Sequence, residues 1–232
     1  MVLEEWIVEL RQVAAERLVS LIEFGSAVRS EPRRTGSDTN LLIVLDSANA
    51  EVLEKIGAVL RDGFRELRVE PMILERAEIQ SVVDCFAQKM REIQRRHAVL
   101  AGDDVVAELK FDREHLRIAV EQGLRNALVR LRKKVALSVG DPLGLRAALL
   151  ELLGPMTAEL DAWLELRNQP VDALATRAQT VAAAVSALQG AGGGFEALLA
   201  FSVSGVGEPI EVAKSLMDSL AAAIALIDRP EA

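Results

Sequence analysis

The sequence predicts an α/β (α+β) domain with a small mixed sheet, followed by an all-α helical bundle. Over residues 1–104, apolar runs of strand length alternate with amphipathic stretches of helical period. Over residues 105–232 the strand-like runs stop and apolar positions recur at helical spacing. The composition is half hydrophobic but only 3% aromatic, which favours helices over an all-β fold. We therefore expect two domains, 1–104 and 105–232.

The first domain should alternate helices and strands. The expected order is a helix from residue 3, strands at 18–24 and 41–45, a helix after 47 that ends at 63, a strand at 67–74, and one long helix at 78–96. Residues 41–45 are apolar throughout, so this strand should be buried on both faces. Pro71 lacks a backbone donor, so its strand should lie at an edge of the sheet or carry a bulge.

The second domain should begin with a long helix at 112–139, because its apolar residues follow the 3.6-residue period. Further helices are expected at 143–153, 158–167, 171–188, 195–201 and 211–227. Gly154-Pro155 predicts a break between the first two of these.

Two motifs at strand ends carry the clearest functional signal. Gly25-Ser26 ends the first strand, a basic loop follows, and Asp38-Thr39-Asn40 opens the next strand. Residues i and i+2 of a strand point to one face, so Asp38 and Asn40 should lie side by side. This arrangement resembles the nucleotidyltransferase superfamily (the DNA polymerase beta-like or minimal nucleotidyltransferase fold), whose motif is Gly-Ser, a loop, and Asp-x-Asp on a strand.

The resemblance implies a role for each matching residue. The phosphates of a nucleoside triphosphate would be bound, at the start of a helix, by Gly25, Ser26, Arg29 and Ser37. The metal ligands would be Asp38, Asn40 and Glu70, of which Asp38 and Glu70 are the catalytic carboxylates. The cofactor implied is Mg²⁺.

The metal-binding half of the motif departs from the family pattern. Nucleotidyl transfer uses two Mg²⁺ ions, which prefer anionic oxygen ligands. Asn40 replaces the second Asp and removes one negative charge, and Glu70 is longer than the usual third Asp. The sequence therefore predicts a nucleotide-binding protein with a weakened magnesium site and little or no transferase activity.

Two alternative functions remain open. One is an active Mg²⁺-dependent nucleotidyltransferase that modifies a hydroxyl group of a small molecule or a protein. The other is a non-catalytic interaction or regulatory module that acts through the helical domain, with a homodimer as one form of such an interaction.

The helix expected at 112–139 also resembles helical C-terminal domains that follow stand-alone nucleotidyltransferase modules in bacteria. Arg117, Glu121 and Arg125 form one stripe at i, i+4 spacing. The stripe has two interpretations: a cleft face that offers Glu121 as a general base, or a solvated row of ion pairs.

Charge and hydropathy limit the partners. The formal net charge is −8, which argues against general binding to nucleic-acid phosphates. The late apolar stretch 220–227 is far shorter than the ~20 residues of a membrane span. The acidic residues near the N-terminus argue against a signal peptide. The single cysteine, Cys85, excludes a disulfide within the chain. We expect a cytoplasmic protein without a membrane partner.

Overall fold

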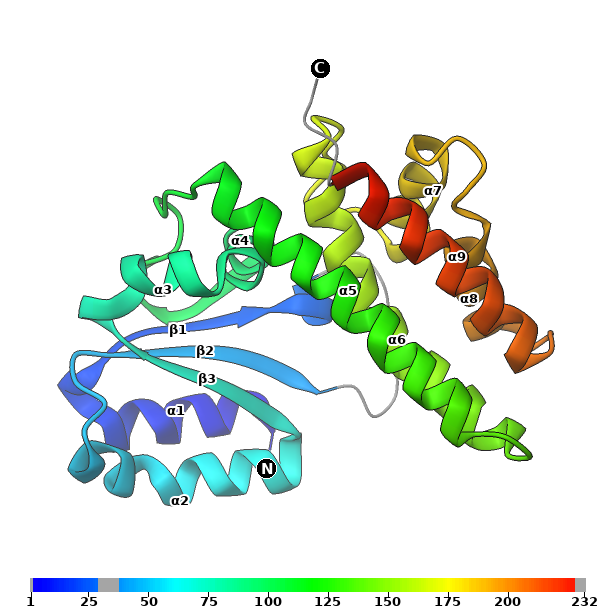
Figure 1. Cartoon of the computed structure of the whole chain (residues 1–232). Helices are drawn as coiled ribbons and strands as arrows, with labels where there is room; N and C mark the ends of the chain where they lie inside the picture. The colour runs from blue at the N-terminus through cyan, green and yellow to red at the C-terminus, as the bar shows by residue number, and fades with distance from the viewer. Residues whose placement is uncertain (1, 29–37, 228–232) are drawn as a thin grey trace. The chain divides into compact units, whose positions relative to one another are not determined.

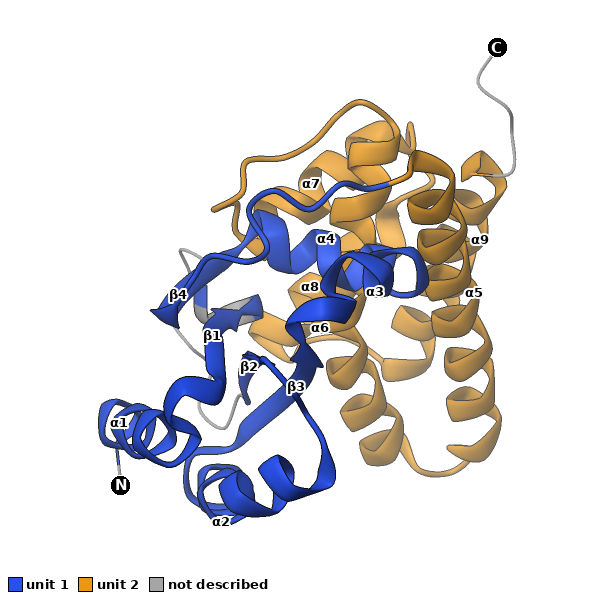
Figure 2. Cartoon of the chain, turned by 90° about the vertical axis from the view of Figure 1, so that its left-hand side faces the viewer, with its two compact units in different colours: residues 1–111 blue, residues 112–232 orange. Residues whose placement is uncertain are grey.

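The computed structural model describes residues 2–28 and 38–227, and the chain divides into two compact units, Met1–Phe111 and Asp112–Ala232 (Figure 2). The elements of the first unit are α1 (Leu3–Ala14), β1 (Leu18–Phe24), β2 (Thr39–Leu45), α2 (Ala50–Leu67), β3 (Val69–Glu75), α3 (Ile79–Cys85), α4 (Ala87–Arg95) and β4 (His97–Gly102). The second unit contains α5 (Arg113–Leu137), α6 (Pro142–Leu166), α7 (Arg177–Ala187), α8 (Gly193–Ser204) and α9 (Pro209–Ile227) (Figure 1). This order confirms the predicted fold class.

The first unit is built on a mixed sheet with the strand order β3-β2-β1-β4. β1 runs antiparallel to β2 and to β4, whereas β2 and β3 are parallel. The parallel pair is possible because α2 returns the chain to the starting end of the sheet. β3 is an edge strand, as Pro71 predicts, and every residue of Leu41–Leu45 is buried, as expected for a central strand.

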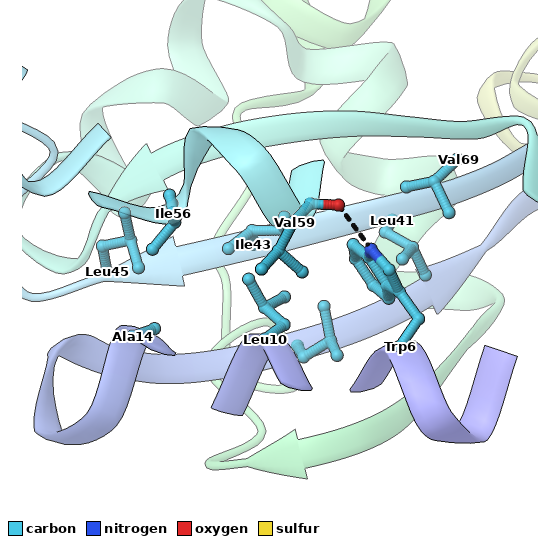
Figure 3. Packing of buried hydrophobic residues seen from close by; sticks show 10 residues of the cluster. Trp6, Leu10, Ala14, Leu41, Ile43, Leu45, Ile56, Val59 and Val69 are labelled. Carbon is cyan, nitrogen blue, oxygen red and sulfur yellow. Dashed lines mark hydrogen bonds between the residues drawn. The ribbon is translucent and has the colours of Figure 1, made fainter. Parts of the chain in front are cut away.

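Alternation along the strands separates two apolar layers. Leu41, Ile43 and Leu45 of β2 pack against α1 and α2, while Leu42 and Val44 pack against α3 and α4. Figure 3 shows the first layer, in which Trp6 and Leu10 of α1 lie between the sheet and α2. Both faces of the sheet are therefore covered by helices.

α1 and α2 approach each other closely around one tryptophan. The buried Trp6 donates its indole Nε1 to the carbonyl oxygen of Val59 at 2.8 Å (Figure 3). A Cβ built at Gly63 would lie 2.7 Å from Trp6 Cε2, which is closer than side chains tolerate. The glycine thus allows the indole ring to lie against the backbone of α2.

The single helix expected at 78–96 is wrong, because the chain forms two helices and then an unpredicted strand. Phe86, at φ −122° and ψ 39°, separates α3 from α4. β4 follows at once and pairs with β1. Its sequence, His97-Ala98-Val99-Leu100-Ala101-Gly102, has no polar and apolar alternation, and its backbone hydrogen bonds with β1 define it as a strand.

The first unit extends to Phe111 because the segment after β4 is bonded to its helices. The Gln94 side-chain amide donates to the carbonyl oxygens of Ala107 at 3.0 Å and Leu109 at 2.9 Å. Val106 is fully buried in the layer formed with α3 and α4. The division between the units consequently falls after 111, whereas the sequence places it after 104.

In the second unit, α6 is continuous through Pro155, so the predicted break at Gly154-Pro155 is wrong. Buried residues on both sides of the proline, including Leu149, Leu153 and Leu160, keep one face of α6 in the core. Packing of this apolar face outweighs the one backbone hydrogen bond that proline removes. Among the described residues, no helix has the length and apolar character needed to cross a membrane.

Candidate functional site

Strand register brings several predicted site residues to one end of the sheet. Phe24, the last residue of β1, lies opposite Asn40, and Asn40 pairs with Glu70 in the parallel ladder. Phe24 belongs to the layer that packs against α3 and α4, so its register partners point to the same face. Asn40 and Glu70 are therefore neighbours there, and Gly25 follows directly at the end of β1.

Gly25 forms the turn that leaves the sheet. Its φ of +82° lies in the left-handed region that glycine adopts without steric cost. A Cβ at this position would lie 3.3 Å from Asn40 Nδ2, so the backbone passes close to the asparagine amide. Gly25–Val28 forms a 3-10 turn at the position where the resemblance implies the start of a helix. The turn includes the backbone of Ser26.

Asp38 is paired with a cation that the sequence motifs do not predict. Its Oδ1 accepts hydrogen bonds from Arg68 Nε at 2.9 Å and from Arg68 Nη2 at 2.7 Å. The side chains are 45% and 59% exposed, so screening by water limits the contribution of this pair to stability. The main effect of the contact is electrostatic. The positive charge of Arg68 offsets the negative charge of Asp38, the one carboxylate that the Asp-x-Asn motif retains.

The backbone of Arg68 is also unusual. Arg68 caps the C-terminus of α2 at φ 54° and ψ 39°, a left-handed conformation that costs an ordinary L-residue about 1–2 kcal/mol. Its amide donates to Gly63 and its carbonyl accepts from Thr39 N at 2.9 Å. These bonds attach the end of α2 to the start of β2 and hold the guanidinium near Asp38. Glycine is the usual residue at such a cap, so an arginine at this position gives no sequence signal of the cap.

Glu70 lies on the edge strand and is exposed. Within the described ranges, no group of three or more His, Cys, Asp or Glu residues is arranged to hold a metal ion. Asn40 offers only a neutral amide, and Asp38 already accepts two hydrogen bonds from Arg68. This donor set does not fit a centre of two Mg²⁺ ions, which requires several anionic oxygens.

A second cation lies on the same face of the sheet. Lys89 of α4 places its Nζ 4.6 Å from the centre of the Phe24 ring and 3.1 Å from Glu92 Oε2. The aromatic face and the carboxylate both attract the ammonium group and hold it near the end of β1. The predicted phosphate-binding residues Arg29 and Ser37 lie outside the described residues.

His97 has a structural role at the start of β4. Its Nδ1 contacts the carbonyl oxygens of Ile93 and Gln94 at the end of α4, and its Nε2 lies 3.1 Å from Asp104 Oδ2. Burial acts to raise the pKa of Asp104, but the hydrogen bonds from His97 and from two backbone amides outweigh it and lower the pKa. These contacts fix the connection between α4 and the segment after β4.

The stripe on α5 forms a continuous row of ion pairs. Arg117 contacts Glu114 at 2.7 Å and Glu121 at 3.0 Å, and Glu121 also accepts from Arg125 at 2.6 Å. Hydrogen bonds from Arg125 and then Arg117 lower the pKa of Glu121. A carboxylate with a lowered pKa is a weaker proton acceptor, so these contacts favour the ion-pair interpretation over a general base.

The mixed sheet, the Gly-Ser turn beside the Asp-x-Asn strand and the helical second unit together define a nucleotidyltransferase-like fold. The chain is similar to a crystal structure of the spectinomycin adenyltransferase AAD(9) from Enterococcus faecialis with ATP and spectinomycin. The TM-score is 0.59 at 13% identity, and the alignment covers 97% of this chain and 99% of that chain. No protein-family model matches the sequence, and no curated protein matches it. At this identity the likeness establishes the fold.

Proposed function

We propose that the protein binds a nucleoside triphosphate at the Gly25 end of the sheet and transfers the nucleotide slowly or not at all. The convergence of Gly25, Asp38, Asn40 and Glu70 at this end carries the proposal: Gly25 and Asp38 match the family motif in sequence, and the strand register pairs Asn40 with Glu70 beside them. The neighbouring adenyltransferase structure contains ATP, which supports a nucleotide as the ligand class.

Each residue has a distinct part in this proposal. The left-handed turn at Gly25 lets backbone amides approach phosphate oxygens, with Ser26, Arg29 and Ser37 as the further predicted phosphate contacts. Asp38, Asn40 and Glu70 are the remnant of the metal-binding set. They supply fewer negative charges than two-metal chemistry uses to stabilise the attacking and leaving oxygens, which is the reason to expect little transfer.

Calorimetric titration with ATP, GTP and CTP, each with Mg²⁺ and with a chelator, tests the binding. We expect saturable binding of at least one nucleotide, weakened in Asp38→Ala or Gly25→Val. Absence of binding to all three would refute the proposal. An assay with labelled triphosphate tests the second part: transfer at ordinary enzymatic rates, abolished in Asp38→Ala, would show an active transferase that modifies a small-molecule or protein hydroxyl.

A second function is favoured by one feature of the helical unit. Large apolar side chains are exposed around two of its helix connections: Leu137, Val139 and Leu143 at the end of the α5–α6 hairpin, and Val203 in the last turn of α8 with Val206 in the connection to α9. Arg146 Nη1 donates to the carbonyl oxygen of Gly205 at 3.0 Å, so the two connections are neighbours. We propose that this apolar end, defined by these five residues, joins two copies of the chain in a homodimer; sedimentation measurements test it.

A further inference from the structure

We infer that Arg68 takes the place of a divalent cation at this site, so that the protein binds the triphosphate of a nucleotide without Mg²⁺. This inference rests on the proposed nucleotide binding and adds a cofactor independence that the family motif does not imply. It names Arg68 as a phosphate-binding residue, held in position by Asp38.

The position of Arg68 in the fold is the first support. Arg68 immediately precedes β3, and its carbonyl is bonded to Thr39 at the start of β2. In the parallel ladder of β2 and β3, Thr39 pairs with Val69, and Asn40 pairs with Glu70 one residue further on. Arg68 therefore lies at the same end of the sheet as Gly25 and Asn40, where the triphosphate is expected.

The second support is the hydrogen-bonding capacity of the guanidinium. Arginine carries five N–H donors in a planar fork, and two of them point to Asp38 Oδ1. Among the described residues, the Arg68 side chain pairs with Asp38 alone, and it is 59% exposed. The remaining donors are accessible to a phosphate, which guanidinium groups bind with paired, charge-assisted hydrogen bonds.

The third support is the charge that a metal ion would meet. Mg²⁺ ligated by Asp38 would either displace the guanidinium or lie beside it, and like charges at such distances repel. Asn40 provides no negative charge to compensate for this repulsion. A triphosphate, in contrast, is attracted to this site, because its negative charge interacts favourably with Arg68 and with the Lys89 ammonium group near the end of β1.

The conformation of Arg68 provides a clean variant. Arg68→Gly removes the guanidinium and relieves the left-handed backbone strain, so the protein should fold at least as well as the wild type. Arg68→Lys keeps the charge but lacks the paired donors. Arg65→Ala is the matched control, because Arg65 is an exposed cation in the last turn of the same helix.

Equilibrium dialysis of ATP, in EDTA and in Mg²⁺, distinguishes the possibilities. The wild type and Arg65→Ala should bind ATP in EDTA about as tightly as in Mg²⁺. Arg68→Gly should lose about ten- to a hundredfold in affinity in EDTA, the loss expected for hydrogen bonds to charged groups, and regain part of it in Mg²⁺ because Asp38 is released. Arg68→Lys should fall between the two.

Three results would overturn the inference. If the wild type binds ATP only in Mg²⁺, the inference fails while the proposed nucleotide binding stands. If Arg68→Gly, with a melting temperature no lower than that of the wild type, binds ATP in EDTA as tightly as the wild type, Arg68 is not a phosphate-binding residue. If the wild type binds no ATP in either condition, the proposed function fails and the inference fails with it.

Discussion

Replacing Asn40 with aspartate adds one negative charge at the Gly25 end of the sheet and tests whether this end can bind a metal ion. We predict that Asn40→Asp lowers the melting temperature in EDTA, because two adjacent carboxylates disfavour each other's ionisation. Mg²⁺ should reverse this loss, since a ligand that binds only the folded state stabilises it, by ~2.7 kcal/mol at a hundredfold excess over its Kd. Thermal melts of wild type and variant, with Mg²⁺ and with EDTA, make the comparison.

Asn40→Ala is the control for this experiment, because it changes the same side chain without adding charge. If Mg²⁺ raises the melting temperature of Asn40→Asp no more than that of the wild type, residues 38 and 40 do not form a metal site. The likeness to nucleotidyltransferases would then extend to the fold only.

The sequence predicts part of this site because the motif and the strand period are local properties. Gly25 and Asp38 flank strands whose apolar runs are readable from the sequence, Asn40 lies at the start of β2, and the register of β2 with β3 adds Glu70. Arg68 was not predicted, because its contact with Asp38 joins residues 30 positions apart. That contact depends on a left-handed helix cap, which no sequence period reveals.

At the scale of elements, the contact of α1 with α2 depends on a missing side chain. Gly63→Ala should destabilise the protein by ~1–3 kcal/mol, because the added methyl group meets the buried Trp6 ring and overpacks the interface. Gly57→Ala, in the same helix, has nothing within 4 Å of the new Cβ and should stabilise by about 0.5–1 kcal/mol. Urea unfolding measures both, and equal effects of the two substitutions would contradict this account of the packing.

The ion-pair row on α5 predicts a pH dependence of stability. The pKa of Glu121 is lowered in the folded state, first by the hydrogen bond from Arg125. Its stabilising contribution is therefore complete above the unfolded-state pKa of about 4.3 and is lost as the pH falls through the lower folded-state pKa. Glu121→Gln should unfold at lower urea concentration than the wild type at pH 7, and the difference should shrink as the pH falls below about 4.3.

Glu151→Gln provides the comparison, because Glu151 is exposed on α6 and lies outside the ion-pair row. This control should show a small effect with little change over the same pH range. A difference between wild type and Glu121→Gln that persists undiminished to pH 3 would mean that the charge of Glu121 is not what stabilises α5.

The elements that the sequence did not predict share a physical cause. β4 lacks polar and apolar alternation and exists through its pairing with β1. Likewise, α6 passes through Pro155 because buried residues on both sides hold one helix face in the core. Tertiary contacts decide both cases, whereas β2 is predictable from its continuous apolar run and the body of α2 from its helical period, although α2 continues past the expected end at 63 to Leu67.

At the scale of the whole molecule, the segment after β4 illustrates why a domain boundary is hard to read from composition. Gly102-Asp103-Asp104 looks like the start of a linker, but Gln94 and Gln80 bond to the backbone that follows. Val106 completes the adjacent apolar layer. A segment belongs to the unit whose residues form hydrogen bonds and apolar contacts with it. These contacts join residues far apart in the sequence, so composition alone does not reveal them.

The apolar end of the helical unit carries the last prediction. Its five residues include Val139, with 87% of its surface exposed, and Leu143 and Val206, each 77% exposed. Exposed apolar side chains on two neighbouring connections favour association because burial removes their surface from water. We expect sedimentation equilibrium to show a reversible dimer, which a Leu143→Ser, Val206→Ser double variant weakens. Val8→Ser is the matched control, because Val8 is an exposed apolar residue on α1. A wild-type protein that stays monomeric up to millimolar concentration would rule out this interface.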